Sequence, residues 1–142
     1  MATKLTKEQR LILTGRVCPY CGKPTVLANG ADLPWVAAKG PVYACHDCLA
    51  YVGCHPLTTT AMGRLATREL RALRREAHNR FDFIWRNKLK RSRYNAYSWL
   101  ALRMSLPVDM VHIGYFDERQ CRLVIKICDD YISKKMAEQH NN

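Results

Sequence analysis

The sequence predicts an α+β fold, in which a small cysteine-rich ribbon is packed with a long basic helix and followed by a C-terminal helical region. Three observations lead to this prediction. Gly, Pro, Cys and β-forming residues dominate residues 16–60, and two CxxC pairs lie among them. From about Thr67 onward, apolar residues recur at the spacing of one helix face. Most of the net positive charge lies in that helical stretch.

The chain divides into four predicted segments: an N-terminal helix at residues 1–15, the ribbon at 16–60, a helical region with the basic helix at 61–136, and a disordered tail at 137–142. Thr6 and Gln9 have the spacing of a helix capping box, and Gly15 is expected to end the first helix. Within the ribbon, "RVCPYCGKPTVLA" and "PVYACHDCLAYVGC" are typical of short hairpins. The loop between them carries turn signals such as Asn29-Gly30.

Capping residues and apolar spacing predict three further helices. Thr67 is expected to cap the basic helix, whose inner face holds Leu70, Leu73, Ala77, Phe81 and Ile84. Ser92 is expected to cap a second helix that stops before Pro107, with a short helical turn after that proline. Asp117 and Gln120 form another capping box, and the inner face of the last helix holds Cys121, Val124, Ile125, Cys128 and Ile132.

The two CxxC pairs have the spacing of a metal site. Cys18 and Cys21 are separated from Cys45 and Cys48 by 23 residues. Two such knuckles facing each other supply four thiolates to one Zn²⁺ ion, and Gly22 permits the left-handed turn after the first knuckle. Disulfides and a redox CxxC are the alternatives, but a redox motif normally lies in a βαβ setting that is absent here. A four-ligand site has no open position, so this zinc is structural and the ribbon is a four-cysteine zinc ribbon.

The remaining cysteines and histidines allow two interpretations. Cys54 could fill the core beneath the ribbon while His55 bonds a backbone group, or His55 could face His78 and Asp82. Such a cluster could bind a second metal or provide general acid–base catalysis, although Asp82 could instead pair with Arg86. Cys121 and Cys128 lie on an apolar stripe, which favours buried thiols.

The net charge of +11 is concentrated in one segment. Residues 64–93 contain eleven basic and three acidic residues, a net +8, which leaves +3 for the rest of the chain. Wherever this stretch is helical, one face holds Arg64, Arg68, Arg71 and Arg75, whose like charges repel one another. A helix that needed charge only for solubility would alternate the two signs, so this row favours contacts with phosphates. The alternative is a solvated face, or arginines packed against the ribbon and the last helix. The predicted phosphate-binding residues are Arg64, Arg68, Arg71, Arg74, Arg75, Arg80, Lys88, Lys90, Arg91 and Arg93, with Tyr94, Tyr97 and Trp99 as candidates for base stacking.

The paired "CPYC" and "CHDC" knuckles are followed by "YVGCHPLTTTAMGRLATRELRALRREAHNRFDFIW", "SRYNAYSWLA" and "HIGYFDERQC". In order and spacing, over most of residues 16–130, this chain resembles a family of zinc-finger-containing domains found largely in phage and prophage genomes. It departs at Ala61-Met62-Gly63, where the family has Pro-Leu-Gly. The resemblance implies a zinc-bearing viral protein. The residues that match characteristic family positions are Gly53, His55, Gly63, His78, Phe81, Asp82 and Trp85.

Together with the phage origin that the resemblance implies, these observations favour a zinc-ribbon protein that binds DNA or RNA through its arginine-rich helix. One alternative is a viral effector that binds a host protein or a nucleoprotein complex such as a polymerase, a ribosome or a defence system. The other is a metal-assisted nuclease built on His55, His78 and Asp82. It is the least favoured of the three hypotheses, because the sequence lacks the run of acidic residues that usually holds Mg²⁺. With no apolar run approaching about 18 residues and no secretory signal, we expect no membrane partner and a location in the cytoplasm, that of the host if a phage encodes the chain.

Overall fold

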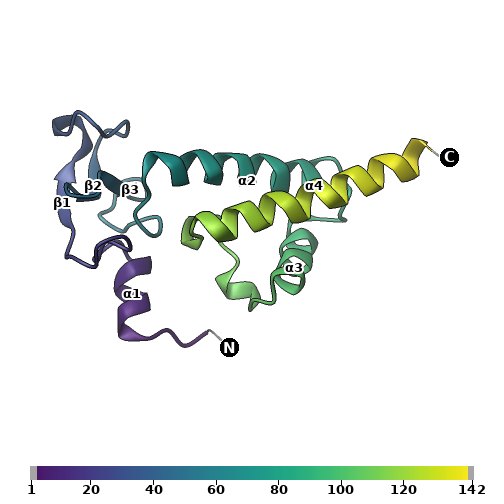
Figure 1. The fold of residues 1–142 in the computed structure, drawn as a ribbon, viewed down its shortest axis with the longest axis horizontal. Helices are drawn as coiled ribbons and strands as arrows, with labels where there is room; N and C mark the ends of the chain where they lie inside the picture. The colour runs from purple at the N-terminus through teal and green to yellow at the C-terminus, as the bar shows by residue number, and fades with distance from the viewer. Residues whose placement is uncertain (1–2, 141–142) are drawn as a thin grey trace. The chain divides into compact units, whose positions relative to one another are not determined.

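The computed structural model describes residues 3–140 and contains the mixture of helices and a small antiparallel sheet that the sequence predicts. It forms two compact units, one from Lys4 to Arg71 and the other from residues 72–140 together with Thr3. The elements (Figure 1) are α1 Lys7–Leu13, β1 Val26–Asn29, η1 Gly30–Asp32, β2 Pro41–Cys45, β3 Ala50–Gly53, α2 Arg68–Arg86, α3 Arg93–Met104, η2 Val108–Met110, η3 Ile113–Tyr115 and α4 Glu118–His140.

The first unit, which we call the ribbon unit, is built on a three-stranded antiparallel sheet in the order β1-β2-β3. The second predicted hairpin is present, with Cys45 paired to Ala50 across the turn. The first predicted hairpin is reduced to a single bridge between Val17 and Pro24, closed by the N–H groups of Cys18 and Thr25, which donate to the carbonyls of Lys23 and Arg16. The chain after Pro24 instead pairs with β2, and Val26 lies opposite Ala44.

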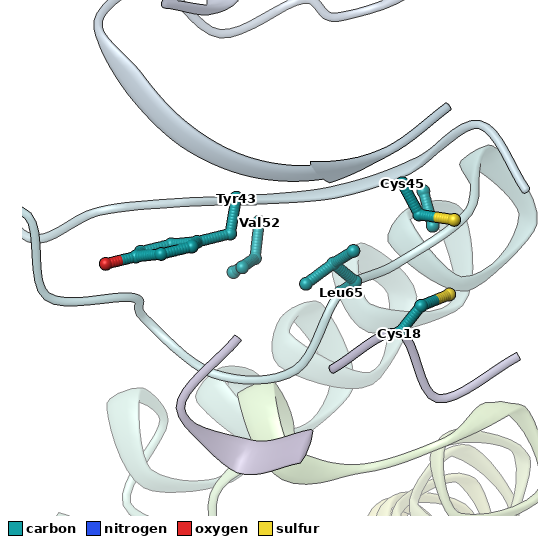
Figure 2. Close-up of a cluster of buried hydrophobic side chains, with 6 residues drawn as sticks. Cys18, Tyr43, Cys45, Val52 and Leu65 are labelled. Atoms are coloured by element: carbon teal, nitrogen blue, oxygen red, sulfur yellow. The ribbon is translucent and has the colours of Figure 1, made fainter. Parts of the chain in front are cut away.

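Strand β2 is buried on both faces, which explains its continuous apolar sequence. On one face, Cys18, Tyr43, Cys45, Ala50, Val52 and Leu65 form a cluster. In Figure 2 the sulfur atoms of Cys18 and Cys45 lie at one end of this cluster and the hydroxyl of Tyr43 at the other. The loop after β1 covers the opposite face, where a second cluster contains Val36, Val42, Ala44 and Tyr51, with Leu33, Trp35 and Ala38 packed against it.

The ribbon unit includes α1 and the first turn of α2. The predicted capping box of α1 is present, with Thr6 and Gln9 bonded to each other's backbone N–H groups. Thr67 caps α2 by accepting the backbone N–H of Leu70 at 3.3 Å. Ala66 forms an isolated bridge with Tyr51, which ties the residue before this cap to strand β3.

The second unit, which we call the helical unit, packs the remainder of α2 with α3 and α4. Phe81 is fully buried and its ring lies 4.6 Å from that of Tyr97. The Tyr131 hydroxyl of α4 donates to the carbonyl of Leu89 at 2.8 Å, which joins α4 to the turn after α2. The predicted caps hold at both later helices, because Ser92 accepts from the backbone N–H of Asn95 and Asp117 from that of Gln120.

The end of α4 corrects one expectation. Residues 137–140, which the sequence analysis assigns to a disordered tail, are helical, while residues 141–142 lie outside the described part. Lys135 and Glu138 pair at 3.4 Å along this last stretch, and the helix-forming residues around them favour continuation of α4. Among the described residues, no helix has both the length and the apolar character needed to cross a membrane.

Candidate metal centre

The first knuckle is a tight turn that begins at Cys18, shortly after the end of α1 at Leu13. The backbone N–H of Cys18 donates to the Lys23 carbonyl at 2.9 Å, and the N–H of Gly22 donates to the Cys18 carbonyl at 2.9 Å. These two bonds fold the chain back, so that the Cys18 and Cys21 side chains come together. Gly22 has a φ of 77°, a left-handed conformation that glycine adopts without steric cost.

The second knuckle is the turn of the β2–β3 hairpin. Cys45 ends β2, and Cys48 lies in the turn that leads to Ala50. Leu49 occupies the position that Gly22 has in the first knuckle, directly after the second cysteine, and it too is left-handed, with a φ of 52°. The two knuckles therefore repeat one backbone design, although only the first uses the residue that favours it.

The four sulfur atoms lie together. All four Sγ atoms of Cys18, Cys21, Cys45 and Cys48 are within 4.8 Å of one another, and those of Cys21 and Cys45 are 3.7 Å apart. A tetrahedral site with Zn–S bonds of about 2.3 Å separates its sulfurs by about 3.8 Å. The donor set and its spacing therefore fit one structural zinc ion, as the sequence predicts. All four ligands come from the protein, so the site has no position for a reacting water.

The cysteine thiols of this cluster differ in the direction in which their pKa values are shifted. Burial raises the pKa of Cys18, and burial together with hydrogen bonds from the other three cysteines raises the pKa of Cys48 to about 12. A hydrogen bond from the backbone N–H of Lys23 lowers the pKa of Cys21. Without a cation, four crowded sulfurs cannot all be thiolates, so the metal must displace protons when it binds.

An ion pair joins the two knuckles from outside. Lys23, two residues after Cys21, lies 2.8 Å from the carboxylate of Asp47, which sits between Cys45 and Cys48. Asp47 raises the pKa of Lys23, and the nearby Cys21 and Cys45 sulfurs raise it further. Because both charged groups are exposed, this pair contributes little to the stability of the fold. The sequence analysis missed this ion pair, although the sequence places a basic residue beside the first knuckle and an acidic residue within the second.

The other three cysteines lie outside this group. Cys54 is half-buried at the edge of the ribbon cluster and faces Ala61 in an isolated bridge. Burial raises its pKa, so that the thiol stays protonated. Cys121 and Cys128 are fully buried in α4, and burial raises the pKa of Cys128 to about 12. These positions agree with the interpretation of all three as packing residues.

His55 belongs to the ribbon unit, whereas His78 and Asp82 belong to the helical unit. His55 is exposed on the loop after β3 and lines an open hollow of about 800 Å³. His78 and Asp82 lie on α2 in the helical unit, where Asp82 accepts a hydrogen bond from the Trp85 indole at 2.9 Å and pairs with Arg86 at 3.7 Å. Desolvation lowers the pKa of His78, while Asp82 opposes that shift. Within either unit, over residues 3–140, the only group of three or more clustered metal-ligating side chains found is the four cysteines.

The predicted row of arginines is interrupted in the structure. Arg64 precedes α2, so it is not part of the helix. Arg71 lies over the Tyr51 ring at 4.1 Å and donates to the carbonyl of Ala66 at 2.7 Å. Other predicted phosphate-binding residues also have intramolecular contacts, among them Arg74 with the Gly114 carbonyl at 2.9 Å, Arg80 with Asp129 at 3.2 Å, Lys90 with the Tyr131 ring at 4.7 Å, and Arg93 with the Tyr97 hydroxyl at 3.4 Å.

The other predicted cations remain exposed, and most of them gather at one place. Arg68 and Arg75 are exposed along α2, while Lys88, Arg91 and Arg93 are exposed where α2 ends and α3 begins. Residues 86–94 contain five basic and no acidic residues. Arg86, which is not among the predicted phosphate-binding residues, pairs with Asp82 at 3.7 Å and still has 66% of its side chain exposed. We call the exposed set the basic corner: Arg86, Lys88, Arg91, Arg93 and Tyr94.

Comparison with known proteins adds one finding. A family model described as a zinc-finger-containing domain matches residues 14–131, a range that includes both knuckles, α2, α3 and most of α4. No curated protein and no solved structure matched the chain.

Proposed function

Because the chain belongs to the family of zinc-finger-containing domains, we propose that its zinc ribbon stabilises a nucleic-acid-binding protein and that the basic corner is the surface that contacts the nucleic acid. Phage origin and a cytoplasmic location are parts of the same proposal. A tetrathiolate site needs reduced cysteines, which the cytoplasm maintains.

The observation that carries this proposal is the local excess of charge at residues 86–94. Five cations without one carboxylate repel one another, which costs stability unless an anion approaches. The nearest acidic residue before this segment is Asp82, which pairs with Arg86. Lys88 and Arg91 are exposed to solvent, where their positive groups can reach phosphate oxygens, and Arg93 is exposed while its guanidinium also donates to the Tyr97 hydroxyl at 3.4 Å.

Tyr94 supports a partner with accessible bases. Its side chain is 74% exposed in the first turn of α3, directly after Arg93. The other aromatic rings near this corner have intramolecular partners. The guanidinium of Arg93 lies 5.7 Å from the centre of the Trp85 ring and 5.5 Å from that of Tyr97, while Trp99 packs on Tyr131. Of the three aromatic residues predicted for base stacking, Tyr94 is therefore the one we retain.

The zinc site contributes to this function through folding. Arg71 in the first turn of α2 is held by Tyr51 and Ala66 of the ribbon unit. The same helix ends at Arg86, where the basic corner begins. Zinc therefore stabilises the sheet on which α2 starts, while the contacts with nucleic acid are made at its far end.

The test measures fluorescence anisotropy of labelled single-stranded RNA, single-stranded DNA and duplex DNA over a range of salt concentrations. We expect binding that weakens steeply with salt, with a log–log slope of about −2 to −4 for three to four displaced counterions. Arg91→Gln and Lys88→Gln are each expected to reduce the magnitude of the slope by about one counterion. The matched control is Arg103→Gln, since Arg103 is an exposed arginine at the other end of α3.

Tyr94→Ala distinguishes stacking from charge. We expect it to weaken binding to single strands by about 1–3 kcal/mol without changing the salt slope. Leu102→Ala is its control, because Leu102 is an apolar residue of the same helix with 82% exposure. If Arg91→Gln and Arg103→Gln had equal effects, or if binding did not depend on salt, the proposed surface would be wrong.

A further inference from the structure

We propose that a hollow between the end of α3 and the start of α4 is a docking site for an acidic peptide segment of a partner protein, with an apolar side chain as its anchor. The hollow has a volume of about 440 Å³ and lies within the helical unit. This volume falls in the range of about 300–1,000 Å³ that is typical of ligand pockets. Its lining residues are Met104, Leu106, Arg119, Gln120, Leu123 and Lys126, together with Arg122.

The hollow exists because of how α3 ends. Ser105 is left-handed, with a φ of 56°, and turns the chain sharply at the helix terminus. The N–H of Leu106 then donates to the Ala101 carbonyl at 3.0 Å, which fixes Leu106 beside the last turn. The first turns of α4 supply the opposite wall, where Arg119 and Lys126 are seven residues apart and so share a helix face.

The lining combines an apolar part with positive charge. Met104, Leu106 and Leu123 supply the apolar part, and Leu123 keeps 41% of its surface exposed. Two more apolar residues of the adjoining stretch are exposed, Leu102 at 82% and Val108 at 51%. Arg119 and Lys126 supply charge, and the pair of Lys126 with Asp130 at 3.2 Å is open to solvent and therefore weak.

This combination fits an acidic peptide better than a nucleic acid. None of the lining residues is aromatic, so a base would find no ring among them to stack on. A peptide can place an aliphatic or aromatic side chain against Met104 and Leu123, while flanking carboxylates approach Arg119 and Lys126. The overall charge of +11 would also attract an acidic partner before contact.

The test uses a fluorescein-labelled peptide in which Asp and Glu residues flank one phenylalanine, and a control peptide with serine in place of that phenylalanine. Leu123→Ala is expected to weaken binding of the first peptide about tenfold, a loss that corresponds to one buried anchor. Met136→Ala is the matched control, because Met136 is an apolar residue of α4 with 38% exposure that does not line the hollow. We expect it to change the affinity less than about twofold.

A second pair of variants tests whether a positive charge acts at the hollow itself or only through the net charge of the protein. Arg119→Glu and Lys134→Glu change the net charge equally, and both residues are exposed on α4, but only Arg119 lines the hollow. We expect Arg119→Glu to weaken peptide binding about tenfold and Lys134→Glu less than about threefold. Circular dichroism of each variant verifies that the helices remain folded.

Several outcomes would overturn the proposal. Equal binding of the phenylalanine and serine peptides would show attraction by charge alone, and equal effects of Arg119→Glu and Lys134→Glu would have the same meaning. If Arg119→Glu weakened binding of an oligonucleotide more than Lys134→Glu did, the hollow would belong to a nucleic-acid surface. If the protein self-associated and Leu123→Ala abolished this, the occupant would be a second copy. Arg91→Gln should leave peptide binding unchanged. The peptide-docking proposal can therefore fail while the nucleic-acid proposal for the basic corner stands, and the reverse.

Discussion

Gly22→Ala measures how much the backbone of the first knuckle contributes to zinc binding. Gly22 has a φ of 77°, and a Cβ atom at this position would meet nothing within 4 Å. The substitution therefore introduces backbone strain without a clash and without new packing. A left-handed conformation costs a residue with a Cβ about 1–2 kcal/mol.

The strain is partly offset in the unfolded state. Alanine restricts the unfolded chain more than glycine does, which increases the free energy of unfolding by about 0.4–1 kcal/mol. The net cost is then about 1 kcal/mol, because the first effect exceeds the second. If the knuckle adopts this conformation when it binds metal, the strain falls on the zinc-bound state and weakens zinc affinity about fivefold.

Gly40→Ala is the matched control. Gly40 is also left-handed, with a φ of 90°, and its added Cβ would likewise meet nothing within 4 Å. Both variants should lose similar stability in urea unfolding with excess zinc. Competition with a chromophoric chelator should show reduced zinc affinity for Gly22→Ala alone. Equal zinc affinity of wild type and Gly22→Ala, or an equal loss in Gly40→Ala, would refute the link between this turn and the metal.

Three further predictions concern the zinc site and the two cores. Zinc affinity should fall as the pH is lowered from about 8 to 6, because the raised pKa values of Cys18 and Cys48 leave protons that Zn²⁺ must displace, and chelator competition at each pH measures this. The stability of the zinc-bound form should therefore be present at high pH and lost as the pH falls, whereas a pH-independent affinity would contradict the assigned protonation. Phe81→Ala should lower the free energy of unfolding by about 3–5 kcal/mol, because Phe81 is fully buried, and half-buried Phe83→Ala should cost clearly less in the same urea titration. Gly15→Ala should destabilise the ribbon unit more than Gly40→Ala, because its Cβ would lie 2.9 Å from that of Ala61 in addition to the strain of a φ of 75°; equal midpoints in urea would show that Ala61 moves aside.

Features set by short-range interactions could be predicted from the sequence. The capping box at Thr6 and the cap at Ser92 depend on atoms three residues apart, and both are present. The zinc ion could be predicted for a related reason. A CxxC pair brings two sulfurs together by local turn geometry, so the spacing already specifies half of the site.

Features that depend on distant residues could not be predicted in this way. The loop after β1 is only a series of turn signals in the sequence, yet in the structure Val36 and Trp35 cover one face of the sheet. The hollow beside Leu123 arises because Ser105 redirects the chain toward α4. Leu49 gave no signal of a left-handed conformation, because the hairpin imposes that conformation on a residue that does not favour it.

The arginines of α2 show what the sequence determines and what only the tertiary structure decides. By itself, the sequence determined the knuckle spacing, the capped starts of the helices and the concentration of positive charge between residues 64 and 93. Arg71 and Arg75 are the same residue type four positions apart on one helix, yet Arg71 lies against Tyr51 while Arg75 is exposed. Only the tertiary structure decided between them, because a side chain's environment depends on which distant atoms the fold brings within its reach.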